Sequence, residues 1–341
     1  MLGKDLTLDD LLDRDGYRSV ILAIGAHKSR ELHIEGEEME GVYHGTQFLR
    51  DIALGKSPDL SGKRVAVVGG GDVAIDAVRS AWRLGAGGVH LVYRRSRADM
   101  PARDDEVEAA EKEGIQFHFL TNPNRVIGNG KVTGVELLRQ ELGAFDASGR
   151  RRPVPIPGSE FTIDTEVLIP AIGQEPDLFW LDGDSTIETG RGATFAVSDG
   201  LATARRGVFA AGDAVLGPAT VIQAVAQGNQ VADEVDHYLR TGRVEKVVVR
   251  PGYEIIEQRF DMEQYYKAVR PSVRELAIEE RRGNFNEVEL PLDERTIQEE
   301  CKRCIRCDLE WLETMGLELA PVAEQVQVQP GQLGLTEEEN A

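Results

Sequence analysis

An uninterrupted apolar run at residues 65–68 enters three consecutive glycines, and this pattern predicts a buried strand that turns directly into a helix. Residues 74–84 follow with apolar side chains three or four positions apart, as on one face of a helix. A second glycine-rich stretch then leads into another apolar run at 89–93. The pattern predicts a β–α–β unit whose two strands are parallel.

Further elements are predicted on both sides of this unit. Apolar runs indicate strands at 19–24, 115–120, 166–172 and 207–211, and helical patterns indicate helices at 8–12, 74–84, 104–113, from 219 onward, and at 292–312. The pair Asn129-Gly130 lies between two apolar runs and is typical of a tight hairpin turn. We therefore expect an antiparallel meander, with strands at 125–127 and 132–137, that crosses over the parallel sheet.

Composition narrows the class of protein. The chain has 341 residues, 41% of them hydrophobic and 36 of them glycine, which is typical of an α/β protein. A formal net charge of −20 argues against nucleic acid or an anionic membrane as the main partner, because both would be repelled. No apolar run resembles a signal peptide or could cross a bilayer, so we expect a cytoplasmic protein without membrane insertion.

The glycines after the first strand supply candidate chemistry. In a dinucleotide-binding turn, the first glycine permits a tight bend, the second lets the backbone approach a pyrophosphate, and a small residue three positions later lets the helix pack on the strand. The candidate cofactor-binding residues are Gly69, Gly70, Gly71, Asp72, Val73 and Ala74. Backbone amides at the helix start would face the phosphates. The alternative is an ordinary glycine-rich turn of a parallel sheet.

Two arginines at the end of the second strand bear on cofactor choice. Arg94 and Arg95 lie about twenty residues after the glycine turn, where an NAD-selective site usually has a carboxylate for the ribose hydroxyls. Guanidinium groups there could hold a 2′-phosphate through forked, charge-assisted hydrogen bonds. The sequence therefore favours NADP(H) over NAD(H). The alternative is that both arginines belong to a solvated strand end.

Several motifs occur together in a characteristic order. They are the strand ends Ile24-Gly25 and Ile172-Gly173, the glycine turn, the run 93–97 with Met100-Pro101 after it, and Ala211-Gly212-Asp213. Over roughly residues 4–240 the chain resembles the two-dinucleotide flavoproteins, most closely the small (beta) subunit of NADPH-dependent glutamate synthase. The resemblance implies an α/β fold in which a Rossmann-like NAD(P)-binding domain is inserted into an FAD-binding domain.

The resemblance also implies a domain organisation. Residues 1–57 would be the end of a first FAD-domain segment, 58–178 the NAD(P)-binding domain, 179–240 a second FAD-domain segment, and 241–341 an extended arm with an acidic tail. We expect the arm to wrap a neighbouring protein and the tail at 321–341 to be partly disordered. The alternative for the arm is a solvated tail.

By position, the resemblance implies cofactor roles for further residues. Arg94 and Arg95 would hold the 2′-phosphate, and Asp213, after Gly212, would hold the flavin ribityl chain. The helix starting near Ala219, Thr220 and Val221 would direct its positive end at the isoalloxazine. The two strand ends contribute Gly25, Ile172 and Gly173 to the predicted cofactor site.

The sequence departs from that family in one respect. The FAD-binding half normally opens with its own glycine-rich turn and a ribose-binding acid, and no such turn precedes Ser19. We expect that a separate subunit supplies this segment or that the sequence is a fragment. FAD binding by the remaining half alone is a third possibility.

Three cysteines form one cluster near the end of the chain. Cys301, Cys304 and Cys307 have the two-residue spacing that lets successive thiolates converge on one metal centre. An iron–sulfur cluster, a [4Fe-4S] cluster with its fourth ligand from elsewhere, is favoured over zinc, and absence of a metal is the third reading. A cytosolic disulfide is a poorer interpretation.

These observations give one main functional hypothesis. The chain would be a flavin-dependent subunit that exchanges hydride with NADP(H) and passes electrons to iron–sulfur centres of partner subunits in a larger complex. The competing hypothesis is a nucleotide-binding assembly subunit without flavin. The sequence indicates no separate set of catalytic side chains.

Overall fold

The computed structural model describes residues 2–146, 149–181, 186–190, 192–246, 269–301 and 303–304. The chain divides into two compact units, Met1–Val249 with Leu276–Glu287, and Arg250–Glu275 with Val288–Ala341. The predicted tail at 321–341 and Cys307 lie outside the described residues. Among the residues that are described, no helix is long and apolar enough to cross a membrane.

The first unit is built on a parallel sheet. Its four strands, in spatial order, are β10 (Val167–Pro170), β3 (Arg64–Val68), β4 (Gly88–Tyr93) and β5 (Gln116–Phe119). All three neighbouring pairs are parallel. The predicted β–α–β unit is therefore confirmed, with the helix α2 (Asp72–Arg83) between β3 and β4.

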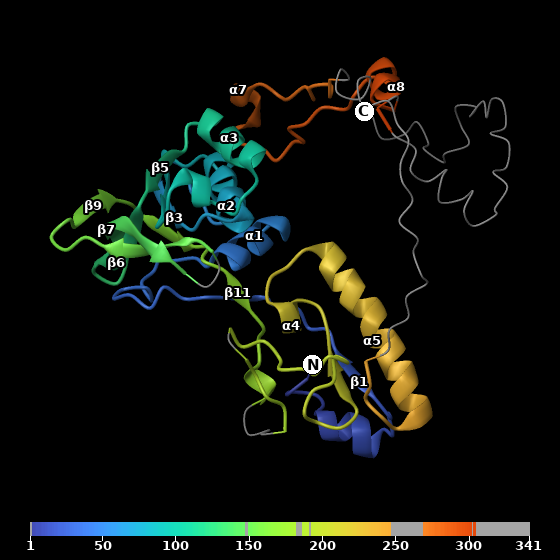
Figure 1. Ribbon diagram of the computed structural model, residues 1–341. Helices are drawn as coiled ribbons and strands as arrows, with labels where there is room; N and C mark the ends of the chain where they lie inside the picture. The colour runs from blue at the N-terminus through green and yellow to red at the C-terminus, as the bar shows by residue number, and fades with distance from the viewer. Residues whose placement is uncertain are drawn as a thin grey trace. The chain divides into compact units, whose positions relative to one another are not determined.

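The two faces of this sheet are covered differently (Figure 1). On one face Val65 and Val67 pack against α1 (Gly45–Ala53), α2 and α3 (Asp104–Lys112). On the other face Ala66 and Val68 pack against an antiparallel sheet of β6 (Thr121–Gly128), β7 (Val132–Phe145), β8 (Arg151–Pro155) and β9 (Phe161–Asp164). Burial on both faces explains why β3 is apolar at every position after Arg64.

The antiparallel sheet contains the predicted hairpin and two further strands. β6 and β7 pair on either side of Asn129-Gly130, as the turn signal predicted. Both strands are longer than predicted, and β8 and β9, which the sequence pattern did not reveal, both pair with β7. The sequence of β8 shows little alternation of apolar and polar residues, because four of its five residues are exposed.

A second body in the same unit has its own core. The strands β1 (Val20–Leu22) and β12 (Val208–Ala210) form a parallel pair. One face packs against a π-helical turn at Asp10–Arg14, a 3-10 turn at Phe179–Leu181 and the short helix α4 (Asp213–Leu216), and the other face packs against the long helix α5 (Val221–Thr241). The predicted helix at 8–12 is confirmed and continues to Arg14 as the π-helical turn, and the predicted strand at 19–24 is shorter.

Two short strands run between these bodies. β2 (Lys28–Ser29) and β11 (Gln174–Glu175) pair antiparallel, with Ser29 opposite Gln174. Each follows one of the two Ile-Gly strand ends, and Figure 1 shows β11 crossing from the parallel sheet toward α4 and β1. The two Ile-Gly strand ends, which are alike in sequence, therefore each lead into a short strand between the two bodies, and these two strands pair with each other.

Residues 276–287, in the stretch where the sequence predicted an arm, belong to the first unit. Arg281, on α7 (Ile278–Arg281), donates to Glu113 Oε1 at 3.2 Å, and Glu113 also receives two hydrogen bonds from Arg79 at 3.0 Å. The Glu113 side chain is 0% exposed. The adjacent Arg282 lies over the Trp82 ring. A buried carboxylate therefore fixes this segment to α2.

The second unit contains α8 (Glu294–Cys301), within the helix predicted at 292–312, and residues beyond 304 are not described.

We predict that Glu113→Ala lowers the free energy of unfolding by about 3–5 kcal/mol, because it removes the buried carboxylate that Arg79 and Arg281 share. The control Glu108→Ala, at an exposed position of α3, which ends at its C-cap Glu113, should change it by less than about 0.5 kcal/mol. Urea denaturation measures both. Equal values for the two variants would show that the buried carboxylate is not a structural centre.

Candidate functional site

The turn between β3 and α2 depends on close packing at two of its glycines. A Cβ on Gly69 would lie 2.3 Å from the carbonyl oxygen of Ala171, and φ of Gly69 is +150°. A Cβ on Gly70 would lie 2.4 Å from the ring of Tyr93. The backbone therefore passes between β10 and β4 in a space that only glycine fits.

Gly71 differs from its two neighbours because its missing side chain leaves open space. The nearest atom to a Cβ there would be Pro101 Cγ at 3.8 Å. Gly71 is also the N-cap of α2, and no side chain caps this helix start. Ala74, in the first turn of α2, is fully buried against the sheet. The helix start thus presents backbone amides at a surface that a phosphate can approach closely.

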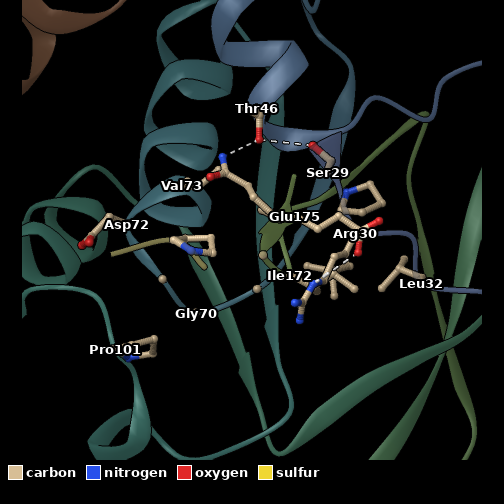
Figure 2. A pocket seen from close by; sticks show the side chains of 18 of the residues that line it. Ser29, Arg30, Leu32, Thr46, Gly70, Asp72, Val73, Pro101, Ile172 and Glu175 are labelled. Carbon is tan, nitrogen blue, oxygen red and sulfur yellow. Dashed lines mark hydrogen bonds and ion pairs between the residues drawn. The ribbon is translucent and has the colours of Figure 1, made fainter. Parts of the chain in front are cut away.

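These residues open on one cavity of about 1170 Å³. Figure 2 shows it from close by, with Gly70, Asp72 and Val73 on one side and Arg30, Ile172 and Glu175 on another. Of the predicted site residues, Gly69, Gly70, Gly71, Asp72, Val73, Arg94, Arg95, Ile172, Gly173, Asp213, Ala219 and Thr220 line it. The structure therefore gathers residues that are up to 151 positions apart in the sequence, from Gly69 to Thr220.

Four predicted residues do not line this cavity. Ala74 is buried behind the turn, and Val221 points outward with 82% of its surface exposed. The Gly212 amide donates to Gln227 Oε1 at 2.7 Å. Gly25 has φ of +69° and packs near the imidazole of His27. Each of the four adjoins a residue or strand of the site in the sequence.

The start of α5 reaches the cavity from the second body. Thr220 is its N-cap, and Thr220 and Gln223 form a reciprocal capping box. Both residues line the cavity, as does Asp213 at the start of α4. The positive end of a 21-residue helix therefore lies at the same cavity as the β3–α2 turn.

The two adjacent arginines at the end of β4 have different surroundings. Arg94 is exposed and lines the cavity. Arg95 is only 4% exposed and donates from Nε to the carbonyl oxygen of Arg151 and from Nη2 to Asp146, both at 2.8 Å. The sequence treated the pair as equivalent, whereas Arg95 is already held by protein groups.

Several cavity residues were missed by sequence reasoning. Thr46 Oγ1 receives a hydrogen bond from Gln174 Nε2 at 2.7 Å and lies 3.2 Å from Ser29 Oγ, as the dashed lines in Figure 2 show. Lys28 and Arg30 form ion pairs with Glu175. These contacts join β2, β11 and α1. The residues of β2 and β11 have one sequence signal, a position shortly after each Ile-Gly strand end, and Thr46 has none.

Arg150 is another residue that the sequence did not single out. It lines the cavity although it belongs to the connection between β7 and β8. The pKa of Arg94 is lowered, mainly because it is partly removed from water and then because Arg95 and Arg150 are positively charged. Arg94 thus has two further arginines near it at the end of β4.

The cysteine cluster lies in the other unit and is only partly described. Cys301 and Cys304 are exposed free thiols, and the Cys304 amide donates to the Cys301 carbonyl oxygen at 3.1 Å. Within the described ranges no three His, Cys, Asp or Glu side chains are placed to share a metal ion. Cys307 is not described, so the predicted metal set is not tested.

The fold and the cavity define a dinucleotide-binding α/β protein with two bodies that meet at one site. The chain belongs to the pyridine nucleotide-disulphide oxidoreductase family, whose model matches residues 4–228. The resemblance to two-dinucleotide flavoproteins is therefore confirmed.

Two relatives illustrate the extent of the similarity. The chain is 45% identical over 316 residues to NADP(+)-dependent formate dehydrogenase subunit beta of Moorella thermoacetica, covering 90% of this chain and 44% of that protein. It is 37% identical over 254 residues to the NADPH glutamate synthase small chain of Escherichia coli strain K12, covering 70% of this chain and 53% of that protein. The chain spans about half the length of these curated relatives.

Among solved structures, Mycobacterium tuberculosis FprA in complex with NADPH matches with a TM-score of 0.60 at 21% identity. The match covers 71% of this chain and 68% of that one. At this identity the likeness is one of fold, and it confirms the predicted α/β class.

We predict that alanine at two neighbouring glycines affects different properties, stability at Gly70 and nucleotide binding at Gly71. Gly70→Ala should lower the free energy of unfolding by about 1–3 kcal/mol, because the Tyr93 ring cannot move away while its hydroxyl donates to the Asp99 carbonyl at 2.7 Å. Gly71→Ala should cost about 1 kcal/mol or less but should weaken binding of any dinucleotide at the turn. Denaturation and nucleotide titration separate the two. Similar stability losses would contradict this description of the turn.

Proposed function

We propose that this chain binds NADP(H) and acts as a flavin-dependent oxidoreductase subunit that passes electrons to iron–sulfur centres of a larger complex. The observation that carries the proposal is the shared cavity. The β3–α2 turn opens on it from one body, and Asp213 and the start of α5 open on it from the other. A nicotinamide nucleotide bound at the turn could therefore extend toward a flavin bound beside α5.

The residues at the turn fit a dinucleotide. Gly71 provides the open space that a pyrophosphate needs, and the uncapped start of α2 provides amides for its oxygens. Arg94 provides positive charge for a 2′-phosphate at the end of the neighbouring strand. Gly69, Gly70, Gly71, Asp72 and Val73 would hold the phosphates.

The residues on the other side fit part of a flavin site. Asp213 would accept hydrogen bonds from ribityl hydroxyls, and the positive end of α5 would stabilise negative charge on a reduced ring. Hydride exchange between nicotinamide and flavin is the chemistry that these two groups supply when bound. The protein's own contribution is to bind and align them and to keep water away.

We infer that the remainder of the FAD site, including the pyrophosphate cradle, is supplied by further polypeptide. The first turns of α5 support this, because Val221, Ile222 and Val225 are exposed by 82%, 71% and 50%. Contiguous exposed apolar side chains on one helix are typical of a surface that another protein covers. The relatives named as subunit beta and small chain are about twice as long as the match.

The iron–sulfur part of the proposal concerns Cys301, Cys304 and Cys307. Two described thiols at this spacing are exposed and have no disulfide partner. Exposed thiolates at two-residue intervals suit a [4Fe-4S] cluster whose fourth ligand comes from elsewhere. A cluster there would receive electrons from the flavin and deliver them to a partner.

An absorption spectrum before and after NADPH addition tests the oxidoreductase proposal. The protein is purified anaerobically with the polypeptides that accompany it. We expect flavin absorption that bleaches on addition of NADPH. A preparation that holds all its partners and shows no flavin absorption would contradict the proposal and favour the nucleotide-binding assembly subunit.

We predict that Arg94→Ala weakens NADPH binding by about 1.5–3 kcal/mol, the size of one charged hydrogen bond. NADH affinity should change little, because NADH lacks the 2′-phosphate. Equilibrium titration with both nucleotides measures the difference. An equal loss for NADPH and NADH would contradict the assignment of Arg94 to the 2′-phosphate.

We also predict that the double variant Cys301→Ser with Cys304→Ser loses most of the iron and acid-labile sulfide of the anaerobically purified complex. Two of three candidate thiolate ligands are then missing. Flavin content and NADPH binding, which belong to the other unit, should remain. Unchanged iron and sulfide would show that the cluster is bound elsewhere in the complex.

A further inference from the structure

Three polar side chains from three different elements meet at the cavity. Ser29 lies on β2, Thr46 in the first turn of α1, and Gln174 on β11. Gln174 Nε2 donates to Thr46 Oγ1 at 2.7 Å, and Ser29 Oγ donates to the same oxygen at 3.2 Å (Figure 2). All three residues are half-buried and line the cavity. The hydroxyl of Thr46 is therefore held by groups from two strands.

These hydrogen bonds determine what the three side chains can offer a ligand. A hydroxyl oxygen has two lone pairs, and on Thr46 both are used, so its own proton has to be donated to a third group. Within the described residues no acceptor for this proton is found, and Gln174 Oε1 accepts no hydrogen bond there. The cluster thus offers one hydroxyl donor and, on the amide that contacts it, one carbonyl acceptor.

The place of this cluster along the sheet indicates which part of a dinucleotide would reach it. The strands lie in the order β10, β3, β4, with the glycine turn after β3 and Arg94 after β4. With the pyrophosphate at the turn and the adenosine 2′-phosphate near Arg94, the other half of the dinucleotide extends toward the end of β10. The start of α1 packs at that end, because a Cβ on Gly45 would lie 3.0 Å from Cβ of Ala171. The cluster is therefore at the nicotinamide end.

The nicotinamide ring has one substituent that matches the two groups on offer. Its primary carboxamide has a carbonyl oxygen that accepts a hydrogen bond and an NH₂ group that donates. The Thr46 hydroxyl can donate to that oxygen, and Gln174 Oε1 can accept from that nitrogen. A primary amide bound in this way satisfies both protein groups, whereas a carboxylate or a ketone would satisfy only the hydroxyl.

We propose that Thr46 and Gln174 bind the carboxamide of the nicotinamide ring, and that Ser29 orients the Thr46 hydroxyl toward it. The proposal rests on the NADP(H)-binding function proposed above and assigns residues to the end of the nucleotide that reacts. The carboxamide is attached beside the ring carbon that carries the hydride. Fixing this substituent therefore limits rotation of the ring and aligns that carbon for transfer.

The first test compares NADP⁺ with 2′-phospho-ADP-ribose, which keeps the phosphates and both riboses but has no nicotinamide ring. Affinities are measured by anaerobic calorimetry with the protein and its accompanying polypeptides. NADP⁺ is used because it cannot reduce an oxidised flavin, so no hydride is transferred. The unchanged protein should bind NADP⁺ about threefold or more tightly than 2′-phospho-ADP-ribose, a difference of at least one hydrogen bond.

Thr46→Val keeps the shape of the side chain and removes the hydroxyl. It should lower the affinity for NADP⁺ by about three- to tenfold, the effect of one lost hydrogen bond, and leave that for 2′-phospho-ADP-ribose within about twofold. Thr46→Ser, which keeps the hydroxyl, should retain the preference for NADP⁺. The unchanged affinity for 2′-phospho-ADP-ribose also shows that the valine variant is folded.

The second test concerns Gln174 and uses the 3-acetylpyridine analogue of NADP⁺, which keeps the carbonyl oxygen but has a methyl group in place of NH₂. The unchanged protein should bind NADP⁺ more tightly than this analogue, and Gln174→Met should bind the two within about twofold of each other. Gln47→Met is the matched control, because Gln47 adjoins Thr46 but is exposed and outside the cavity lining. It should keep the preference of the unchanged protein.

The outcomes separate this inference from the function on which it rests. Equal losses for NADP⁺ and 2′-phospho-ADP-ribose in Thr46→Val would mean that Thr46 supports the cavity or binds a ribose, and would overturn the inference. An unchanged NADP⁺ affinity in that variant, or equal binding of the two probes by the unchanged protein, would overturn it as well and leave NADP(H) binding at the turn intact. If the unchanged protein binds neither probe, the NADP(H) proposal itself fails.

Discussion

The close packing of the β3–α2 turn at the carboxyl end of the parallel sheet is the constraint on which the site depends. The β3–α2 turn lies between the Ala171 carbonyl oxygen and the Tyr93 ring, so side chains are excluded at Gly69 and Gly70. The hydroxyl of Tyr93 is itself bound to the backbone at Asp99. Because the walls of this space are fixed, the first amides of α2 have a fixed direction. A phosphate site built from backbone groups needs that rigidity.

The cavity exists because the chain passes twice between the two bodies of the first unit. β2 and β11 pair with each other, and the contacts of Thr46 with Ser29 and Gln174 connect them to α1. The ends of β3 and β10 therefore open toward the start of α5. In open parallel sheets ligands bind at the carboxyl ends of strands, and here the second body closes that region from outside.

Sequence reasoning succeeded where one local pattern has one structural solution. The apolar run before Gly69, the helical spacing after it and the Asn129-Gly130 turn each specify their element, and all three elements formed as expected. It failed where the outcome depends on distant partners. Nothing in the pair Arg94-Arg95 shows that Asp146, 51 residues after Arg95, binds one of them. The role of Glu113 likewise requires Arg281, from a segment 168 residues further along.

The formal net charge of the chain does not describe the charges that a ligand meets at the candidate site. A protein with a formal charge of −20 repels an anionic nucleotide at long range. Beyond about 8 Å, however, physiological salt screens exposed charges, so a bound phosphate experiences mainly the groups that touch it. The ion pair with Asp146 offsets the charge of Arg95, while Arg94 and Arg150 also line the cavity. The charge that a ligand meets in the cavity thus depends on which ion pairs the fold forms, and only the folded structure shows those pairs.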